Sequence, residues 1–240
     1  MGRTASFLLC VLAAGCGSPD LTIGYYGKYE FSRAERRTIQ RIADKAASDA
    51  RVHLPDLPKK LTLRVESGSD VVPETGAGGT AIPPDWVRWM VDATRPEGVT
   101  AIANTGLRAV LFHEFHHLVR GTKGVPENLM DHVIFEGMAT AFERDFGGAQ
   151  PLMGSYPANV PEWVAELMAL GPEAEQREWL FKHPDGRRWI GFKAGTYLVD
   201  QAMKQSGRNS ADLVLIGTTD VLQLAQAGPT SLNSGLLPNK

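Results

Sequence analysis

Residues 113–117 read His-Glu-Phe-His-His, with two histidines four positions apart and a glutamate directly after the first. Side chains four residues apart lie on the same face of a helix, one turn from each other. Two imidazoles placed in this way can bind a single zinc ion through nitrogen atoms at about 2.0–2.1 Å. Glu114 is rotated by about 100° from His113 around the helix, so it can reach a metal-bound water without becoming a ligand. The pattern predicts His113 and His117 as zinc ligands and Glu114 as the catalytic acid and base.

The surrounding sequence places this motif in an apolar helix. Its apolar residues, which cover almost every side of a helix, are Leu107, Val110, Leu111, Phe112, Phe115, Leu118 and Val119. An ionised carboxylate buried without a partner costs several kcal/mol, so a metal ion explains Glu114 between two histidines better than packing does. The alternative is a cluster of charges with surface histidines at a helix end.

A catalytic zinc site has three protein ligands and a water molecule, so a third ligand is needed. Glu136 is the strongest candidate, because it is a single acid amid apolar neighbours and eighteen residues separate it from His117. A turn over residues 121–125 would let a second helix return antiparallel and bring Glu136 level with the histidines. The small residues Gly137 and Ala139 would then allow these two helices to approach closely. We expect one Zn²⁺ per chain; the alternative for Glu136 is a salt-bridged acid on a helix.

Neighbouring polar residues could orient the ligands, since a zinc-bound imidazole usually donates its second N–H to an acceptor. His132, one turn before Glu136, is one candidate for this role, and Asp131 and Glu143 are the alternatives. His116 could also lie behind the ligands, but a surface position is the simpler interpretation.

The first twenty residues, MGRTASFLLCVLAAGCGSPD, have the character of an export signal. One charge precedes a short apolar run and small residues, and the run is far shorter than the about 20 apolar residues that span a bilayer. The segment from Leu12 to Cys16 resembles the lipobox of bacterial lipoproteins, which implies cleavage before Cys16 and attachment of lipid to its thiol. Cys10 would be removed with the signal, which leaves Cys16 as the single mature cysteine. The alternative is an ordinary signal peptide cut nearby.

This interpretation divides the chain into four parts. They are a signal peptide (residues 1–15), a lipidated cysteine with a tether (16–28), a folded domain (29–227) and a flexible tail (228–240). It also predicts a lipid-anchored protein of the bacterial cell envelope, attached to the membrane through Cys16. Gly17 is not the acidic residue that retains many lipoproteins at the inner membrane, so we expect the periplasmic face of the outer membrane.

The composition fits one globular domain. The chain has 240 residues, of which 43% are hydrophobic and 22% charged, and a chain of this size needs no disulfide framework to fold. The net charge of −2 provides no basic surface for phosphates, so we expect no nucleic-acid partner.

Hydrophobic periodicity predicts a strand-containing first third followed by helices. Ser32 and Glu35 form a capping box ahead of a helix over residues 33–52, and short strands are expected at 61–65, 80–82 and 86–91. The motif helix is expected from about 104 to 120, followed by helices at 126–146, 161–170, 173–181, 189–205 and 210–226. This order predicts an α+β fold rather than a wound parallel sheet.

Three segments of the sequence carry a resemblance to a known family. They are His-Glu-Phe-His-His-Leu-Val-Arg, then Phe-Glu-Gly-Met-Ala, then Gly-Phe-Lys-Ala-Gly from position 191. Together they resemble a bacterial family of predicted zinc-dependent proteases within the gluzincin superfamily of metallopeptidases, over about residues 100–205. The resemblance implies a gluzincin-like domain with a small N-terminal sheet packed on the motif helix, and a mostly helical C-terminal part.

The resemblance also implies roles for individual residues. His113, His117 and Glu136 would be the metal ligands, and Glu114 would be the catalytic acid and base. The region 80–82 would be a sheet edge beside the active helix, where an extended peptide could pair by adding a strand.

One position departs from the family pattern. Many gluzincins carry a tyrosine on a later helix whose hydroxyl stabilises the oxyanion, and Phe192 stands at the matching place. Phenylalanine has no hydrogen-bond donor, and loss of one oxyanion donor can lower the rate by about 10²–10³-fold. Tyr197 and His183 are candidates to replace it, although a packing aromatic and a surface histidine are the simpler interpretations.

Three functional hypotheses follow. The first is a zinc peptidase that hydrolyses peptide or protein substrates at the cell envelope. The second, motivated by Phe192, is a lipoprotein that binds metal or peptide on the same scaffold without turnover. The third is a structural envelope lipoprotein in which the motif is accidental.

Overall fold

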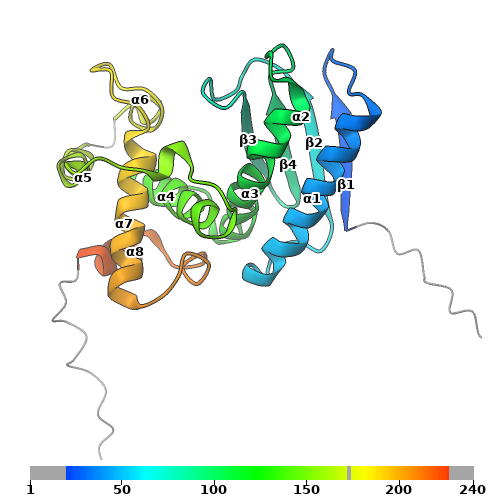
Figure 1. Cartoon of the computed structure of the whole chain (residues 1–240). Helices are drawn as coiled ribbons and strands as arrows, with labels where there is room; N and C mark the ends of the chain where they lie inside the picture. Colours follow the sequence, from blue (N-terminus) through cyan, green and yellow to red (C-terminus); the bar gives the residue numbers. More distant parts are fainter. Residues whose placement is uncertain (1–19, 172–173, 227–240) are drawn as a thin grey trace, which may run out of the picture.

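The structure, a computed structural model, describes residues 20–171 and 174–226 (Figure 1). Cys16, the predicted signal peptide and the predicted tail of residues 228–240 lie outside these ranges. The described chain has a small sheet and several helices, which confirms the predicted α+β class. In the described ranges, none of the helices combines the length and the apolar character needed to cross a bilayer.

The sheet has four strands in the order β1-β2-β4-β3. The strands are β1 (Leu21–Tyr26), β2 (Leu61–Ser67), β3 (Ala77–Ile82) and β4 (Trp86–Val91). β1, β2 and β4 run parallel, whereas β3 pairs antiparallel with β4 and forms one edge of the sheet. The expected sheet edge at residues 80–82 therefore belongs to an edge strand.

β1 differs from the prediction, because its residues lie within the segment that we interpreted as a tether. Leu21 is buried and pairs with Leu61, and Ile23 pairs with Leu63 in the parallel register. The alternation of apolar residues in Leu-Thr-Ile-Gly-Tyr-Tyr is typical of a strand. The folded sheet therefore includes residues 21–26.

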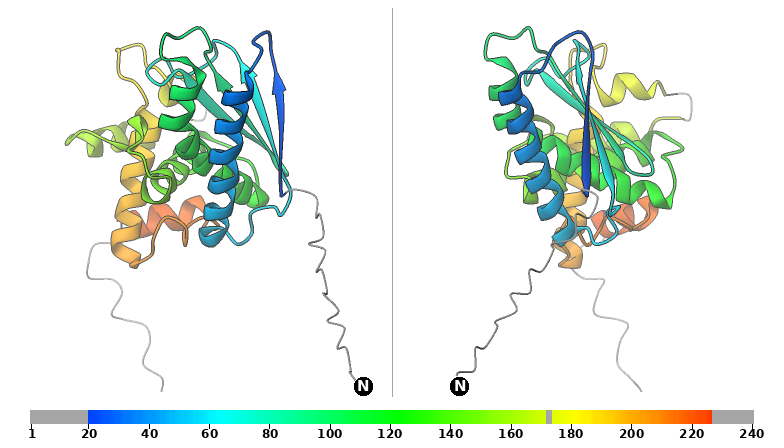
Figure 2. Two further views of the ribbon diagram at one scale, coloured as in Figure 1. Left: turned by 45° about the vertical axis from the view of Figure 1, so that its right-hand side comes forward. Right: turned by 90° about the vertical axis from the view of Figure 1, so that its right-hand side faces the viewer.

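One face of the sheet is covered by two helices, α1 (Arg33–His53) and α3 (Arg108–Arg120) (Figure 2). α1 contacts β1, and α3 contacts β3 and β4. Leu61, Leu63 and Val65 of β2 are buried on this face while the residues between them are half-buried, as expected for a sheet covered on one side. α1 begins at the predicted capping box, in which Ser32 N–H donates to Glu35 at 2.7 Å and Glu35 N–H donates to the Ser32 hydroxyl at 3.3 Å.

The motif helix begins earlier than predicted. α2 (Gly98–Ile102) passes through a π-helical turn at Ala103–Leu107 into α3. The segment is rich in Gly, Thr and Asn, which are poor helix formers, so local propensity does not indicate a helix here. Burial of Val99 and Ile102 in the core stabilises it instead.

A second hydrophobic cluster is formed by the helices that follow α3. These helices are α4 (Leu129–Phe146), α5 (Val160–Met168), α6 (Gln176–Leu180), α7 (Ile190–Ser206) and α8 (Thr218–Gln226). α4 begins three residues later than predicted because the Asn128 side chain caps it by accepting the Asp131 N–H at 3.0 Å.

α8 is much shorter than the predicted helix over residues 210–226. The Asn209 side chain accepts the N–H groups of Ala211 and Asp212 at 2.9 and 3.0 Å. Arg120, from the end of α3, donates to the carbonyls of Val214 and Ile216 at 3.0 and 2.7 Å. Carbonyls held by Arg120 and a side-chain turn at Asn209 compete with helical hydrogen bonds, so the helix begins only at Thr218.

The crossing of α4 and α7 depends on two glycines. A Cβ atom at Gly137 would overlap the backbone of Gly195, and one at Gly195 would overlap the Val133 carbonyl. Gly137 therefore allows α4 to approach α7 closely. The sequence had instead predicted that Gly137 allows α4 to approach the motif helix, α3. α7 is thereby held close enough to α4 to bring Phe192 toward the histidines.

Candidate metal centre

The three predicted ligands come together between α3 and α4, two helices that pack against each other (Figure 1). His113 and His117 lie one turn apart on α3, and their Nε2 atoms are 3.0 Å apart. Glu136 reaches them from α4, with its Oε2 atom 3.1 Å from Nε2 of His113 and 3.3 Å from Nε2 of His117. Arg108, at the start of α3, donates to the Gly147 carbonyl just beyond the end of α4 at 3.1 Å, so the two helices run antiparallel as the spacing predicts.

These distances fit one face of a zinc tetrahedron. Ligand atoms at about 2.0–2.1 Å from a tetrahedral ion lie about 3.3–3.4 Å from each other. The three observed separations of 3.0–3.3 Å are close to that value. Two imidazoles and one carboxylate are also the donor set of a catalytic zinc site that keeps one position for water.

Glu143 sets the orientation of the first histidine. Its Oε2 atom lies 3.1 Å from Nδ1 of His113, and both side chains are 11% exposed. An ionised carboxylate only accepts, so Nδ1 carries the proton and Nε2 is directed to the other ligands. Three acceptor atoms then converge on one point: Nε2 of His113, Nε2 of His117 and Oε2 of Glu136. A cation or a proton is needed there to offset their repulsion. Of the three predicted candidates for this role, the structure places Glu143 there.

The charges in the cluster also favour a cation. Burial alone lowers the pKa of His113, but hydrogen bonds to Glu136 and Glu143 outweigh burial and hold this pKa well above its usual range. Burial alone raises the pKa of Glu136, but His117 and His113 outweigh it and hold this pKa well below its usual range. The Glu136 carboxylate is therefore ionised at neutral pH and attracts positive charge to the point between the ligands.

Glu114 occupies a different position, between the ligands and the edge strand. Burial raises the pKa of its carboxylate, while His113, His117 and the nearby backbone N–H of Ala81 in β3 lower it less. A Cβ atom at Gly79 would lie 2.5 Å from Oε1 of Glu114, so only glycine fits beside this carboxylate. A carboxylate with a raised pKa next to a metal site is suited to accept and return a proton.

Gly79 was not singled out from the sequence, because the strand predicted in this region covered only residues 80–82. The available signal was a glycine inside a run that continues into residues 80–82, because glycine in a strand marks a close approach of another group.

Phenylalanine rings flank both histidines. Phe135 stacks on His117 with ring centres 4.2 Å apart and an interplanar angle of 5°. Phe192 lies over His113 with ring centres 6.5 Å apart, so the structure places it beside the ligands as the sequence pattern implies. Tyr197 instead packs edge-on against Tyr156, and His183 pairs with Asp185 at 2.9 Å in the turn before α7.

In the described part of the chain, Asp131 and His116 do not hydrogen-bond the ligands. Asp131 accepts from the Asn128 amide at 2.7 Å at the start of α4. His116 is fully buried and packs on Phe142 with ring centres 5.5 Å apart, so the surface position expected for it is wrong. Burial lowers its pKa well below the usual value, which keeps it a neutral core residue.

An α+β domain with a His-Glu-x-x-His helix and a glutamate from the next helix defines the class of candidate zinc-dependent hydrolases. Within that class, the chain belongs to the family described as "Predicted Zn-dependent protease (DUF2268)", which matches residues 36–223. None of the curated proteins compared with the chain matches it.

Proposed function

We propose that the protein is a zinc-dependent peptidase of the gluzincin type. The observation that carries this proposal is the position of Glu114. Its buried carboxylate lies directly after a ligand of the three-residue cluster and touches the backbone of an edge strand. A peptide that pairs with β3 would therefore present a carbonyl group to the metal centre and to Glu114 together.

The chain's own groups divide the work of peptide hydrolysis. His113, His117 and Glu136 would hold the zinc ion, which when bound would supply Lewis-acid polarisation of the scissile carbonyl and acidify a water molecule. Glu114 accepts the proton of the attacking water and returns it to the leaving amine nitrogen. The Ala81 N–H stabilises the ionised form of the Glu114 carboxylate, and the flanking phenylalanines keep water away from the back of both imidazoles.

The test is metal content together with cleavage. The purified protein is expected to carry one zinc per chain and to cleave members of a mixed peptide library, with cleavage lost on chelation and restored by zinc. Protein without zinc after metal reconstitution would contradict the proposal.

Phe192 supports a second candidate function, a metal- or peptide-binding scaffold without turnover. It lies against His113 and offers no hydroxyl to an oxyanion. In the same assay this candidate gives one zinc per chain with no cleavage of the library. The variant Phe192→Tyr would then be examined for a gain of cleavage.

We further propose that the peptidase acts at the bacterial cell envelope, on the periplasmic face of the outer membrane. The support is the sequence pattern from Leu12 to Cys16, followed by Gly17. The mature N-terminal peptide is expected to begin at Cys16 and to carry the added mass of acyl chains. A mature protein that begins elsewhere, with no lipid mass, would contradict the anchor.

A further inference from the structure

The backbone N–H and C=O groups of β3 that point to the free edge of the sheet belong to alternate residues. The Asp92 N–H donates to the Gly76 carbonyl at 2.9 Å, and bonded pairs alternate along an antiparallel ladder. Gly78, Thr80 and Ile82 are therefore bonded to β4, whereas the groups of Ala77, Gly79 and Ala81 point to the free edge. The Ala81 N–H, which lies near the Glu114 carboxylate and lowers its pKa, is one of these outward groups.

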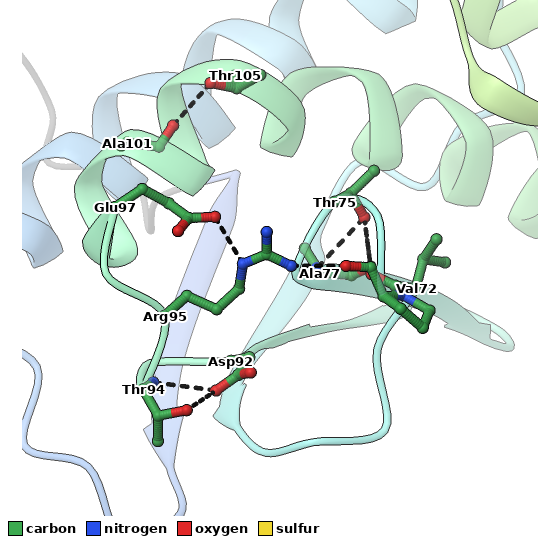
Figure 3. Close-up of polar contacts among 10 residues, drawn as sticks. Val72, Thr75, Ala77, Asp92, Thr94, Arg95, Glu97, Ala101 and Thr105 are labelled. Atoms are coloured by element: carbon green, nitrogen blue, oxygen red, sulfur yellow. Dashed lines mark hydrogen bonds and ion pairs between the residues drawn. The ribbon is translucent and has the colours of Figure 1, made fainter.

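The first outward position is already filled by the chain itself. Residues 72–76, here called the edge turn, fold back so that Val72 forms a β-bridge with Ala77. The Val72 N–H donates to the Ala77 carbonyl at 3.1 Å. The Thr75 hydroxyl donates to the same carbonyl at 3.0 Å (Figure 3). Ala77 is accordingly 3% exposed, while Thr80 and Ile82 further along β3 are exposed.

The edge turn is held on two sides. Arg95 donates from Nη1 to the Pro73 carbonyl at 2.6 Å. Its Nε atom donates to Glu97 at 2.6 Å (Figure 3). On the other side Glu74 forms an ion pair with Arg188, which precedes α7. Val72 also packs against the hydrophobic cluster of the C-terminal helices. The turn thus joins the edge of the sheet to the helical half at one end of β3.

We propose that the edge turn makes this peptidase an enzyme that acts at chain ends, removing one or two residues from the carboxyl terminus of a peptide. The inference rests on the proposed peptidase function. Glu114 touches Gly79 and Ala81, so the scissile bond lies beside these residues. Ala77 is two residues away, about 7 Å along a strand, and its outward groups are occupied. A bound chain therefore has space for about two residues between the scissile bond and the turn.

The direction of the bound chain follows from strand pairing. Antiparallel pairs are more stable per residue than parallel ones and outnumber them two- to three-fold. A peptide antiparallel to β3 directs its carboxyl end toward Ala77 and the edge turn. Its amino-terminal part extends past Ile82, which is 40% exposed, and is free to be of any length.

The experiment compares two versions of one twelve-residue peptide, each incubated with the full-length zinc-loaded protein. One version carries biotin at its amino end and the other at its carboxyl end, and streptavidin binds the biotin. The peptide held by its amino end is expected to lose one or two residues from its carboxyl end. The same peptide held by its carboxyl end is expected to be cleaved at least about tenfold more slowly. Equal cleavage of both at internal bonds, or trimming from the amino end alone, would overturn the proposal and leave the peptidase function intact. Cleavage of neither, together with no cleavage of the library, would overturn the peptidase function itself.

A variant of the turn provides an independent test. Thr75→Val with Arg95→Ala removes the hydroxyl and the guanidinium that hold the edge turn, without touching the ligands. This variant is expected to keep wild-type zinc content and to cleave the carboxyl-held peptide at internal bonds at least about tenfold faster than wild type does. The matched control is Thr62→Val with Arg64→Ala on β2, which should behave as wild type. Unchanged end specificity in a zinc-loaded turn variant would overturn the role of the turn.

Discussion

Replacing Glu114 with glutamine is expected to lower kcat for peptide hydrolysis by about 10²–10⁴-fold while zinc stays bound. Proton transfer by a positioned side chain contributes a factor of this size, and an amide cannot accept the proton of the attacking water. The cluster of ligand atoms comprises His113, His117 and Glu136 without Glu114, so zinc affinity should not change. Single-turnover kinetics and metal analysis on the same sample measure the two effects separately.

The stability of this variant provides a further readout. Glu114 is 6% exposed, and burial of a charged group opposes folding. A neutral amide of the same shape removes that cost, so the melting temperature of Glu114→Gln is expected to equal or exceed that of wild type. The matched control is Glu30→Gln, at an exposed glutamate between β1 and α1, which should leave kcat and zinc content unchanged. A Glu114→Gln protein with more than a tenth of wild-type kcat would remove Glu114 from the proton transfer.

The ligand pattern was readable from the sequence because helical spacing is local. The four-residue spacing of His113 and His117 needs only a helix, and α3 supplies it. Predicting Glu136 required one further step, namely that the next helix returns antiparallel to α3. The connection after Arg120 is short, which makes this the simplest geometry. Both depend on short-range regularities, and the structure brings all three side chains together.

Contacts between elements far apart in the chain were not readable in this way. Glu143 reaches His113 across 30 positions of sequence, and its two rivals, His132 and Asp131, were equally consistent with helical spacing. Gly137 packs on Gly195 because α7 crosses α4 there, which no local pattern indicates. The length of α8 was overestimated for the same reason. Arg120, which is distant in the sequence, binds backbone carbonyls that a longer helix would use.

β1 was missed although its signal was present. The alternation in residues 21–26 is that of a strand, but the preceding export signal favoured a tether for the same residues. A six-residue strand at a sheet edge gains most of its stability from pairing with β2, and the partner strand cannot be identified from the segment alone.

Replacing Glu136 with glutamine is expected to weaken zinc binding by more than the 10–100-fold that a change behind the ligands typically causes. The variant loses both a ligand oxygen and the negative charge that offsets a divalent cation. When zinc is present at 1,000 times its Kd, binding stabilises the native state by about 4 kcal/mol, which corresponds to about 8–16 °C in melting temperature for a domain of this size. Chelation should therefore lower the melting temperature of wild type by about this amount. For Glu136→Gln with a 100-fold weaker Kd, the same zinc concentration gives only about 1.4 kcal/mol, so chelation should lower its melting temperature by no more than about 3–6 °C.

Variants of Glu143 test whether this residue positions a ligand, in contrast to Glu136, which is proposed as a ligand itself. Glu143→Leu removes the acceptor of the His113 Nδ1 proton and is expected to weaken zinc binding by about 10–100-fold. Glu143→Gln keeps a carbonyl oxygen as acceptor and should restore most of the affinity, whereas glutamine at position 136 cannot rescue the lost charge. The exposed Glu127, just before α4, provides the matched control Glu127→Gln with wild-type affinity. If Glu136→Gln bound zinc as tightly as Glu127→Gln does, Glu136 would not be a ligand, and the arrangement of α4 against α3 would need another explanation.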